Sequence, residues 1–281
     1  GFGGTYMALS VEPMIRFFLI SAIAAALLAS YYYLNRLPEW QKMASWLRSA
    51  GGAIFLFACF GSGGVQGLQW IDNSLWALIL LLIGVAVNLY LAWIGGKQVF
   101  SSLHIVLSLL ALGLAPASDL GWGIGVGITL FSVLIAYKPE KWDWHVLATI
   151  IAFFVFHLQW YFYFEDNAQF TSTKHLLGII GIVLVGASVA VMHYRELYVT
   201  TKLEALPLGV HLLNWVFIGM GLLVHSMGGQ WRIIFIALAA IIAFFLARRA
   251  KRLGISWLYH TDTIVSQILA FIAILALEAW E

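Results

Sequence analysis

The charged residues of this chain leave long stretches without any charge, and this placement limits what the chain can fold into. A helix needs about 20 mostly apolar residues to cross the ~30 Å hydrocarbon core of a bilayer. Ten stretches of roughly this kind follow one another, and each predicts a membrane-spanning helix. They lie near residues 17–35, 49–71, 73–96, 98–118, 120–137, 144–164, 175–194, 205–231, 232–247 and 255–277.

Composition excludes the alternative of a soluble globule. Hydrophobic residues make up 62% of the 281 positions and charged residues 10%, whereas roughly a quarter of an ordinary soluble domain is charged. We therefore predict an all-α polytopic bundle that forms a single transmembrane domain over residues 1–281. Because the chain begins with Gly1 and ends at Glu281 beside a span, we expect it to be part of a longer protein.

The last two predicted spans are the least regular. The ninth has only fifteen uncharged residues, 233–247, and we expect the side chain of Arg232 to snorkel toward the interface. The tenth contains Asp262, which lies either inside the helix or, within Thr261-Asp262-Thr263, at the N-cap of a helix that begins at Thr263. Both alternatives remain open at this point.

Basic residues indicate the orientation. With ten spans, the connections alternate between two sides, and twelve Lys and Arg residues fall on one side against three on the other. Lys and Arg gather in cytoplasmic loops, so the rich side is predicted to be cytoplasmic, with both ends of the chain outside, in a bacterial inner membrane. The rich side holds Arg36, Lys42, Arg48, Lys97, Lys138, Lys141, Arg195, Lys202, Arg248, Arg249, Lys251 and Arg252, and the poor side holds Arg16, Lys174 and Arg232.

Glycines gather in the second and fifth spans. They occur at 51–52, 61 and 63–64, and at every second position over 121–127. Small residues let helix backbones approach closely in lipid, whereas the spacing fits neither a phosphate loop nor a dinucleotide fingerprint. The pattern therefore favours helix packing.

Five polar side chains share one depth in four different predicted spans. They lie roughly 8–14 Å below the cytoplasmic surface, at 1.5 Å per residue. Side chains of this kind at such a depth are candidates for function, and they predict a polar cavity open to the cytoplasm if the helices face one another. The alternative is that each one caps a helix, reaches water or bonds to a neighbouring helix. The residues are Asn88, His104, His211, Asn214 and Asp262.

Histidines suggest a further hypothesis. His211 and His225 are fourteen residues apart on one face of a predicted span, and His104 and His157 lie at matching depths. This arrangement resembles the axial ligands of membrane b-type cytochromes, which would imply haem b. No other cofactor and no metal site is predicted, since the only cysteine, Cys59, lies in an apolar run. The four other histidines lie at span ends, where an interfacial position suffices: His145, His175, His193 and His260.

Part of the chain resembles a known family. Pro13-Met14-Ile15-Arg16 precedes a span, a basic loop leads into Ser49-Ala50-Gly51-Gly52-Ala53-Ile54, and a later span closes with Leu114-Ala115-Pro116. Over residues 1–118 the chain resembles the bacterial multi-spanning membrane proteins known as domain of unknown function twenty-three thirty-nine. The resemblance implies a long bundle of many helices and no particular activity or catalytic residues.

These observations leave several functions open. Transport or conduction through the polar cavity is the first hypothesis, and a non-catalytic scaffold or accessory subunit of an envelope complex is the second. Haem-mediated electron transfer is the third. A membrane enzyme acting on a lipid-linked substrate is less favoured, because no Gly-x-Ser-x-Gly or His-Glu-x-x-His motif occurs. The expected partners are the bilayer and other membrane subunits, and the net charge of +2 gives no indication of nucleic-acid binding.

Overall fold

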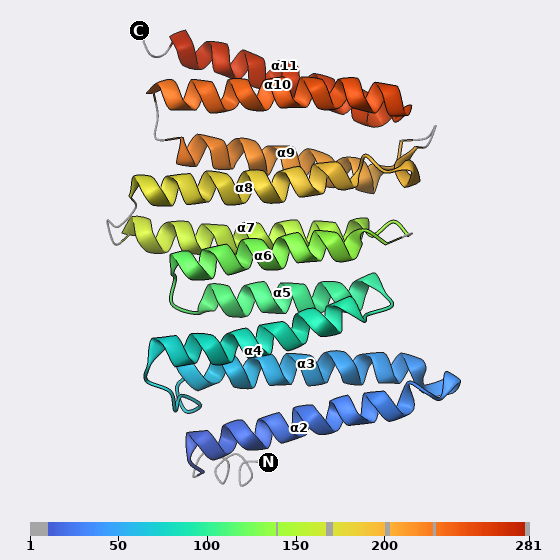
Figure 1. Cartoon of the computed structure of the whole chain (residues 1–281), viewed down its shortest axis with the longest axis vertical. Helices are drawn as coiled ribbons and strands as arrows, with labels where there is room; N and C mark the ends of the chain where they lie inside the picture. The colour runs from blue at the N-terminus through green and yellow to red at the C-terminus, as the bar shows by residue number, and fades with distance from the viewer. Residues whose placement is uncertain (1–10, 139, 167–170, 200–202, 227–228, 279–281) are drawn as a thin grey trace. The chain divides into compact units, whose positions relative to one another are not determined.

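A computed structural model describes the chain except for residues 1–10, 139, 167–170, 200–202, 227–228 and 279–281. Within the described part every regular element is a helix (Figure 1). The helices are α2 (Pro13–Leu34), α3 (Gln41–Gly64), α4 (Ser74–Trp93), α5 (Gln98–Leu114), α6 (Asp119–Ala136), α7 (Asp143–Asp166), α8 (Ser172–Met192), α9 (Ala205–His225), α10 (Gly229–Leu253) and α11 (Ser256–Glu278). Two short 3₁₀ turns, η1 (Pro38–Trp40) and η2 (Glu196–Tyr198), lie between α2 and α3 and between α8 and α9.

The predicted all-α, multi-pass architecture is confirmed. In the described residues nine helices are long and apolar enough to cross a membrane, and α5 is a shorter apolar helix of 17 residues. Several bounds differ from the charge-free runs. Helix α3 begins at Gln41 rather than 49, and α10 continues to Leu253 rather than 247. The reason is that Lys and Arg are good helix formers, so a helix continues through them beyond the apolar segment.

The chain divides into two compact units, residues 1–121 and 122–281, where the sequence predicted one domain. In the first unit α3 packs against α2, α4 and α5. Gly52 lies at this contact, because a Cβ atom there would be 2.6 Å from Cδ1 of Leu91 and 2.8 Å from Cε1 of His104. The packing interpretation of the α3 glycines is thus confirmed at Gly52.

In the second unit, α9 packs against α8, α7, α10 and α11, and α10 and α11 lie closely side by side (Figure 1). Among the glycines of α6, a Cβ at Gly125 would lie 2.2 Å from Cε1 of Phe156. A Cβ at Gly123 or Gly127 would meet nothing within 4 Å. Close packing therefore explains Gly125 but not Gly123 or Gly127.

The start of α11 decides between the two alternatives for Asp262. This helix begins at Ser256, so Asp262 lies in its second turn and is fully buried. The N-cap alternative is therefore wrong, and Asp262 is an ionisable residue inside a helix that is long and apolar enough to span a membrane.

Candidate functional site

Four ionisable side chains of the second unit meet at one end of its helices. Helices α7, α9 and α11 begin at this end and α8 ends there (Figure 1). Asp143 is the first residue of α7, His193 directly follows α8, and His211 and Asp262 lie in the second turns of α9 and α11. All four side chains are buried. We call Asp143, His193, His211 and Asp262 the histidine–aspartate network.

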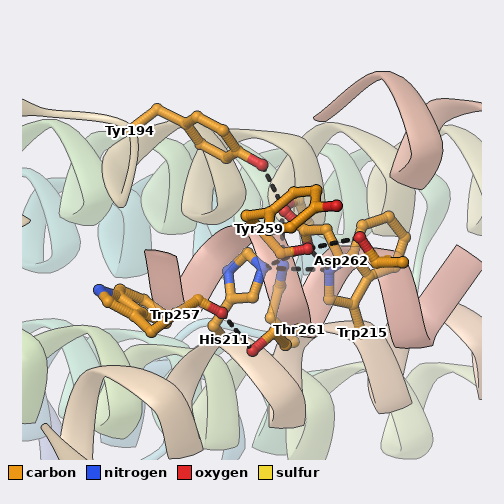
Figure 2. Close-up of polar contacts among 10 residues, drawn as sticks. Tyr194, His211, Trp215, Trp257, Tyr259, Thr261 and Asp262 are labelled. Carbon is orange, nitrogen blue, oxygen red and sulfur yellow. Dashed lines mark hydrogen bonds and ion pairs between the residues drawn. The ribbon is translucent and has the colours of Figure 1, made fainter. Parts of the chain in front are cut away.

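Asp262 is the most completely bonded member of the network. Its Oδ1 lies 2.7 Å from Nε2 of His211 and accepts a hydrogen bond of 2.9 Å from Nε1 of Trp215. The hydroxyl of Tyr194 donates to Oδ2 (Figure 2). Burial of a charge is unfavourable unless it is paired and hydrogen-bonded, and charge-assisted bonds are the strong ones. These contacts therefore allow Asp262 to exist as a carboxylate away from water.

Asp143 and His193 form a looser pair. Tyr198 donates a 2.8 Å hydrogen bond to Oδ1 of Asp143, whereas Nε2 of His193 lies 3.5 Å from the same oxygen. Nδ1 of His193 has no hydrogen-bond partner in the described part of the chain. Burial lowers the pKa of His193 to about 4, an effect that Asp143 opposes and that His211 and Arg195 reinforce. His193 is therefore neutral at pH 7, and neither of its ring nitrogens makes a hydrogen bond within the described residues.

The two pairs lie side by side. The rings of His193 and His211 meet edge to face with centroids 5.3 Å apart, and Trp257 contacts both rings at 5.7 and 5.9 Å. The order across the site is thus Asp143, His193, His211, Asp262. Two adjacent imidazoles cannot both carry a charge without mutual repulsion, so this arrangement disfavours a positive charge on both rings at once.

The remaining predicted cavity residues serve helix packing. In the first unit Oδ1 of Asn88 lies 2.7 Å from Nδ1 of His104, and Nδ2 of Asn88 donates to the carbonyl oxygens of Gly52 (2.9 Å) and Gly84 (3.0 Å). In the second unit Asn214 donates to the carbonyl oxygen of Gly186 at 2.9 Å. Each set makes these contacts inside its own unit, as expected for polar residues that join membrane helices.

The histidines proposed as haem ligands were also located. Nε2 of His157 lies 3.2 Å from Nε2 of His225, so the two rings already bond to each other. Two axial ligands are separated by about twice a metal–nitrogen bond of ~2 Å, and a porphyrin must fit between them. The pair as placed does not fit haem. His104 has both ring nitrogens engaged, by Asn88 and, at 3.4 Å, by Ser49. Among the described residues, no group of three or more His, Cys, Asp or Glu side chains is arranged to hold a metal ion.

Sequence reasoning identified half of the network and missed the other half. It selected His211 and Asp262 by their depth, whereas it assigned His193 an interfacial position and did not select Asp143. The structure buries His193 fully, and it also buries His145, whose Nε2 lies 2.8 Å from the Ser132 hydroxyl. The interfacial interpretation of these two histidines is wrong, although His260 is exposed as expected. The only feature of the sequence that points to Asp143 and His193 is their position at the ends of predicted spans.

Comparison with protein-family models, with curated proteins and with solved structures finds no match to this chain. The resemblance of residues 1–118 to a family of multi-spanning proteins therefore stays a prediction. The functional argument rests on the geometry of the network.

Proposed function

We propose that the protein is a proton-coupled transport or conduction protein and that the histidine–aspartate network is the site where it takes up and releases the proton. The observation that carries this proposal is the pair of His211 and Asp262, fully buried in two membrane-spanning helices and 2.7 Å apart. Ionisable residues inside spans are expensive to bury and mark ion pathways and proton relays in membrane proteins.

The order of the network supports a direction for the proton. Asp143 and His193 lie at the ends of their helices, next to the connections, whereas Asp262 lies in the second turn of α11. A proton entering from the connections would reach Asp143 and His193 first and the His211–Asp262 pair last. A histidine ring suits this task because its two nitrogens can accept a proton on one side and donate one on the other.

The distribution of basic residues supports a cytoplasmic position for this end of the second unit. Cytoplasmic loops carry an excess of Lys and Arg. We infer that the network faces the cytoplasm and that the membrane is a bacterial inner membrane, with the ends of the chain on the other side. Near the network end are Lys138, Lys141, Arg195, Arg248, Arg249, Lys251 and Arg252, against Lys174 and Arg232 at the opposite end, and Lys202 lies outside the described residues.

A scaffold or accessory-subunit role is the second candidate, and α2 is the observation that favours it. Ala24 is the only residue of this helix that is fully buried. One side of α2 packs against α3, and the exposed residues of its other side are left to lipid or to helices of another membrane subunit.

Proton flux into vesicles tests the first candidate against the second. The purified chain is reconstituted with a trapped pH-sensitive dye, and a potassium gradient with valinomycin drives proton entry. Asp262→Asn is the test variant, because it keeps the side-chain volume and an oxygen for Trp215 but cannot exchange the proton. His260→Gln is the matched control, since His260 lies on the same helix and is exposed.

We expect flux with the original chain and with His260→Gln, and loss of most of the flux with Asp262→Asn. Equal flux for Asp262→Asn and the original chain would contradict the proposal. No flux from any variant, together with co-purification of another membrane protein at equal stoichiometry, would favour the accessory-subunit role.

A further inference from the structure

Arg48 of α3 is a buried cation without an acidic partner. Its side chain is 4% exposed, and no carboxylate of the described residues lies within ion-pair distance of it. Nη1 makes one long contact of 3.5 Å to the carbonyl oxygen of Ile94, and Nε has no hydrogen-bond partner. Two aromatic rings lie near its Cζ atom, Tyr31 at 5.4 Å and Phe100 at 5.9 Å. Burial of a charge costs several kcal/mol unless it is paired, and no carboxylate among the described residues pairs with this guanidinium.

The Arg48 guanidinium lies beside the beginning of α5. A Cβ atom at Gly95, in the connection from α4, would be 3.4 Å from Nη2, and Cζ lies 5.9 Å from the ring centroid of Phe100 in the first turn. The N-cap residue of α5 is Lys97, and no side chain caps this helix. The first N–H groups of a helix have no partner within the helix and carry partial positive charge. The guanidinium and these N–H groups thus form two adjacent sets of donors.

The surroundings of this position attract anions and lie at a membrane surface. Lys42 lies in the first turn of α3 and Lys97 directly precedes α5, and these two helices begin at the same end of the first unit (Figure 1). Glu39 is the one acidic residue in the connection between α2 and α3. Trp46 is 57% exposed in α3, and exposed Trp side chains are typical of the headgroup level of a bilayer. Basic pockets between membrane helices at the cytoplasmic side bind phosphate-bearing headgroups.

We propose that Arg48 and the first turn of α5 bind a phosphate group, supplied by the headgroup of an anionic phospholipid. The planar guanidinium can bind two phosphate oxygens at once, and a helix N-terminus is itself suited to phosphate. Gly95 has no side chain, so its backbone lies close to Nη2 of Arg48. This site is in the first unit and is independent of the histidine–aspartate network.

Retention of lipid by the full chain, measured by native mass spectrometry after exchange into phosphatidylglycerol or phosphatidylcholine, tests the proposal. We expect the original chain to retain phosphatidylglycerol preferentially, and Arg48→Gln to weaken this retention roughly tenfold. Arg36→Gln is the matched control, because Arg36 is exposed and stacks on Tyr32, and it should change retention by less than about twofold. Equal retention by Arg48→Gln and Arg36→Gln would overturn the proposal.

A second variant tests the proposal even if Arg48→Gln fails to fold. A Cβ at Gly96 meets nothing within 4 Å, so Gly96→Asp fits without a clash and places a carboxylate beside the start of α5. We expect Gly96→Asp to displace phosphatidylglycerol and Gly96→Ala to leave it bound. Inorganic phosphate is the second probe. If phosphate stabilises the original chain but not Gly96→Asp, and the chain shows no preference for phosphatidylglycerol, the site binds free phosphate and the lipid source is wrong. No difference between Gly96→Asp and Gly96→Ala with either probe would overturn the proposal.

Discussion

The His211–Asp262 pair can be tested as an energetic unit by a double-mutant cycle. The cycle consists of His211→Ala, Asp262→Ala and the double variant, with the free energy of unfolding measured for each. It removes first one and then both partners of a fully buried hydrogen-bonded pair, in which Nε2 of His211 lies 2.7 Å from Oδ1 of Asp262. The effect that the two substitutions share is the energy of the interaction.

The hydrogen bonds of Asp262 determine how much unfolding free energy each variant should lose. Asp262→Ala leaves three donors without their acceptor, from His211, Trp215 and Tyr194. At about 1 kcal/mol for each orphaned group, the variant should lose about 3 kcal/mol. His211→Ala removes one of the three donors to Asp262 and should lose about 2 kcal/mol. Because both single variants break the same bond, the double variant should lose about 1.5 kcal/mol less than the sum, near the upper end for polar pairs in membrane helices.

Unfolding in mixed micelles with increasing sodium dodecyl sulfate provides the assay. Intrinsic fluorescence follows the transition, because Trp215 and Trp257 line the site (Figure 2). His260→Ala is the control at an exposed position of the same helix and should behave like the original chain. Losses that add within ~0.5 kcal/mol would show that the pair makes no net interaction, and the structural reasoning about Asp262 would then be refuted.

Two further predictions concern pH and orientation. Burial lowers the pKa of His193 from 6.5 to about 4, so only the unfolded chain takes up this proton between those values, and stability should fall by up to about 3 kcal/mol as pH drops through that window. Melting temperatures against pH should show this fall, His193→Gln should reduce its slope, and an unchanged slope in the variant would contradict the assignment. Glu140 and Thr171 are exposed and lie at opposite ends of α7. Thr171→Cys should react with an impermeant maleimide in intact spheroplasts, whereas Glu140→Cys should react only after lysis. Cys59 is buried and should give little background. Reaction of Glu140→Cys in intact spheroplasts would contradict the proposed orientation.

The sequence predicts the helices of this protein well because the length of an apolar run is enough to identify a helix that spans a bilayer. A charge-free run must be long enough to cross the hydrocarbon, and all backbone groups must be satisfied within it. The same criterion fails at the ends of helices, where nothing in the bilayer prevents α3 from beginning before its apolar segment or α10 from continuing through Arg248 and Arg249.

The sequence predicts how deep the candidate residues lie in the membrane, but not which neighbouring helix each of them faces. Counting from the span ends placed Asn88, His104, His211 and Asp262 at one level, and the structure gives each of them a polar partner. Which helix faces which is decided by packing, so the sequence could not separate Asn88–His104 in one unit from His211–Asp262 in the other. His193 was missed for a related reason, since a histidine at a span end meets either water or a neighbouring helix.

The course of α9 bears on how a proton could cross the second unit. His211 and His225, fourteen residues apart and about 21 Å along the axis, are both fully buried, and His225 bonds to His157. Between them α9 carries no titratable side chain, and Ile218 and Leu222 belong to the apolar core shared with α8, α10 and α11. Proton transfer needs successive donors and acceptors within hydrogen-bond reach. Beyond Asn214 and Trp215, in the turn after His211, this segment of α9 supplies no such side chain before His225. Under the proposed function, this favours a carrier, in which the network loads its proton and a change of conformation moves it, over a continuously open proton channel.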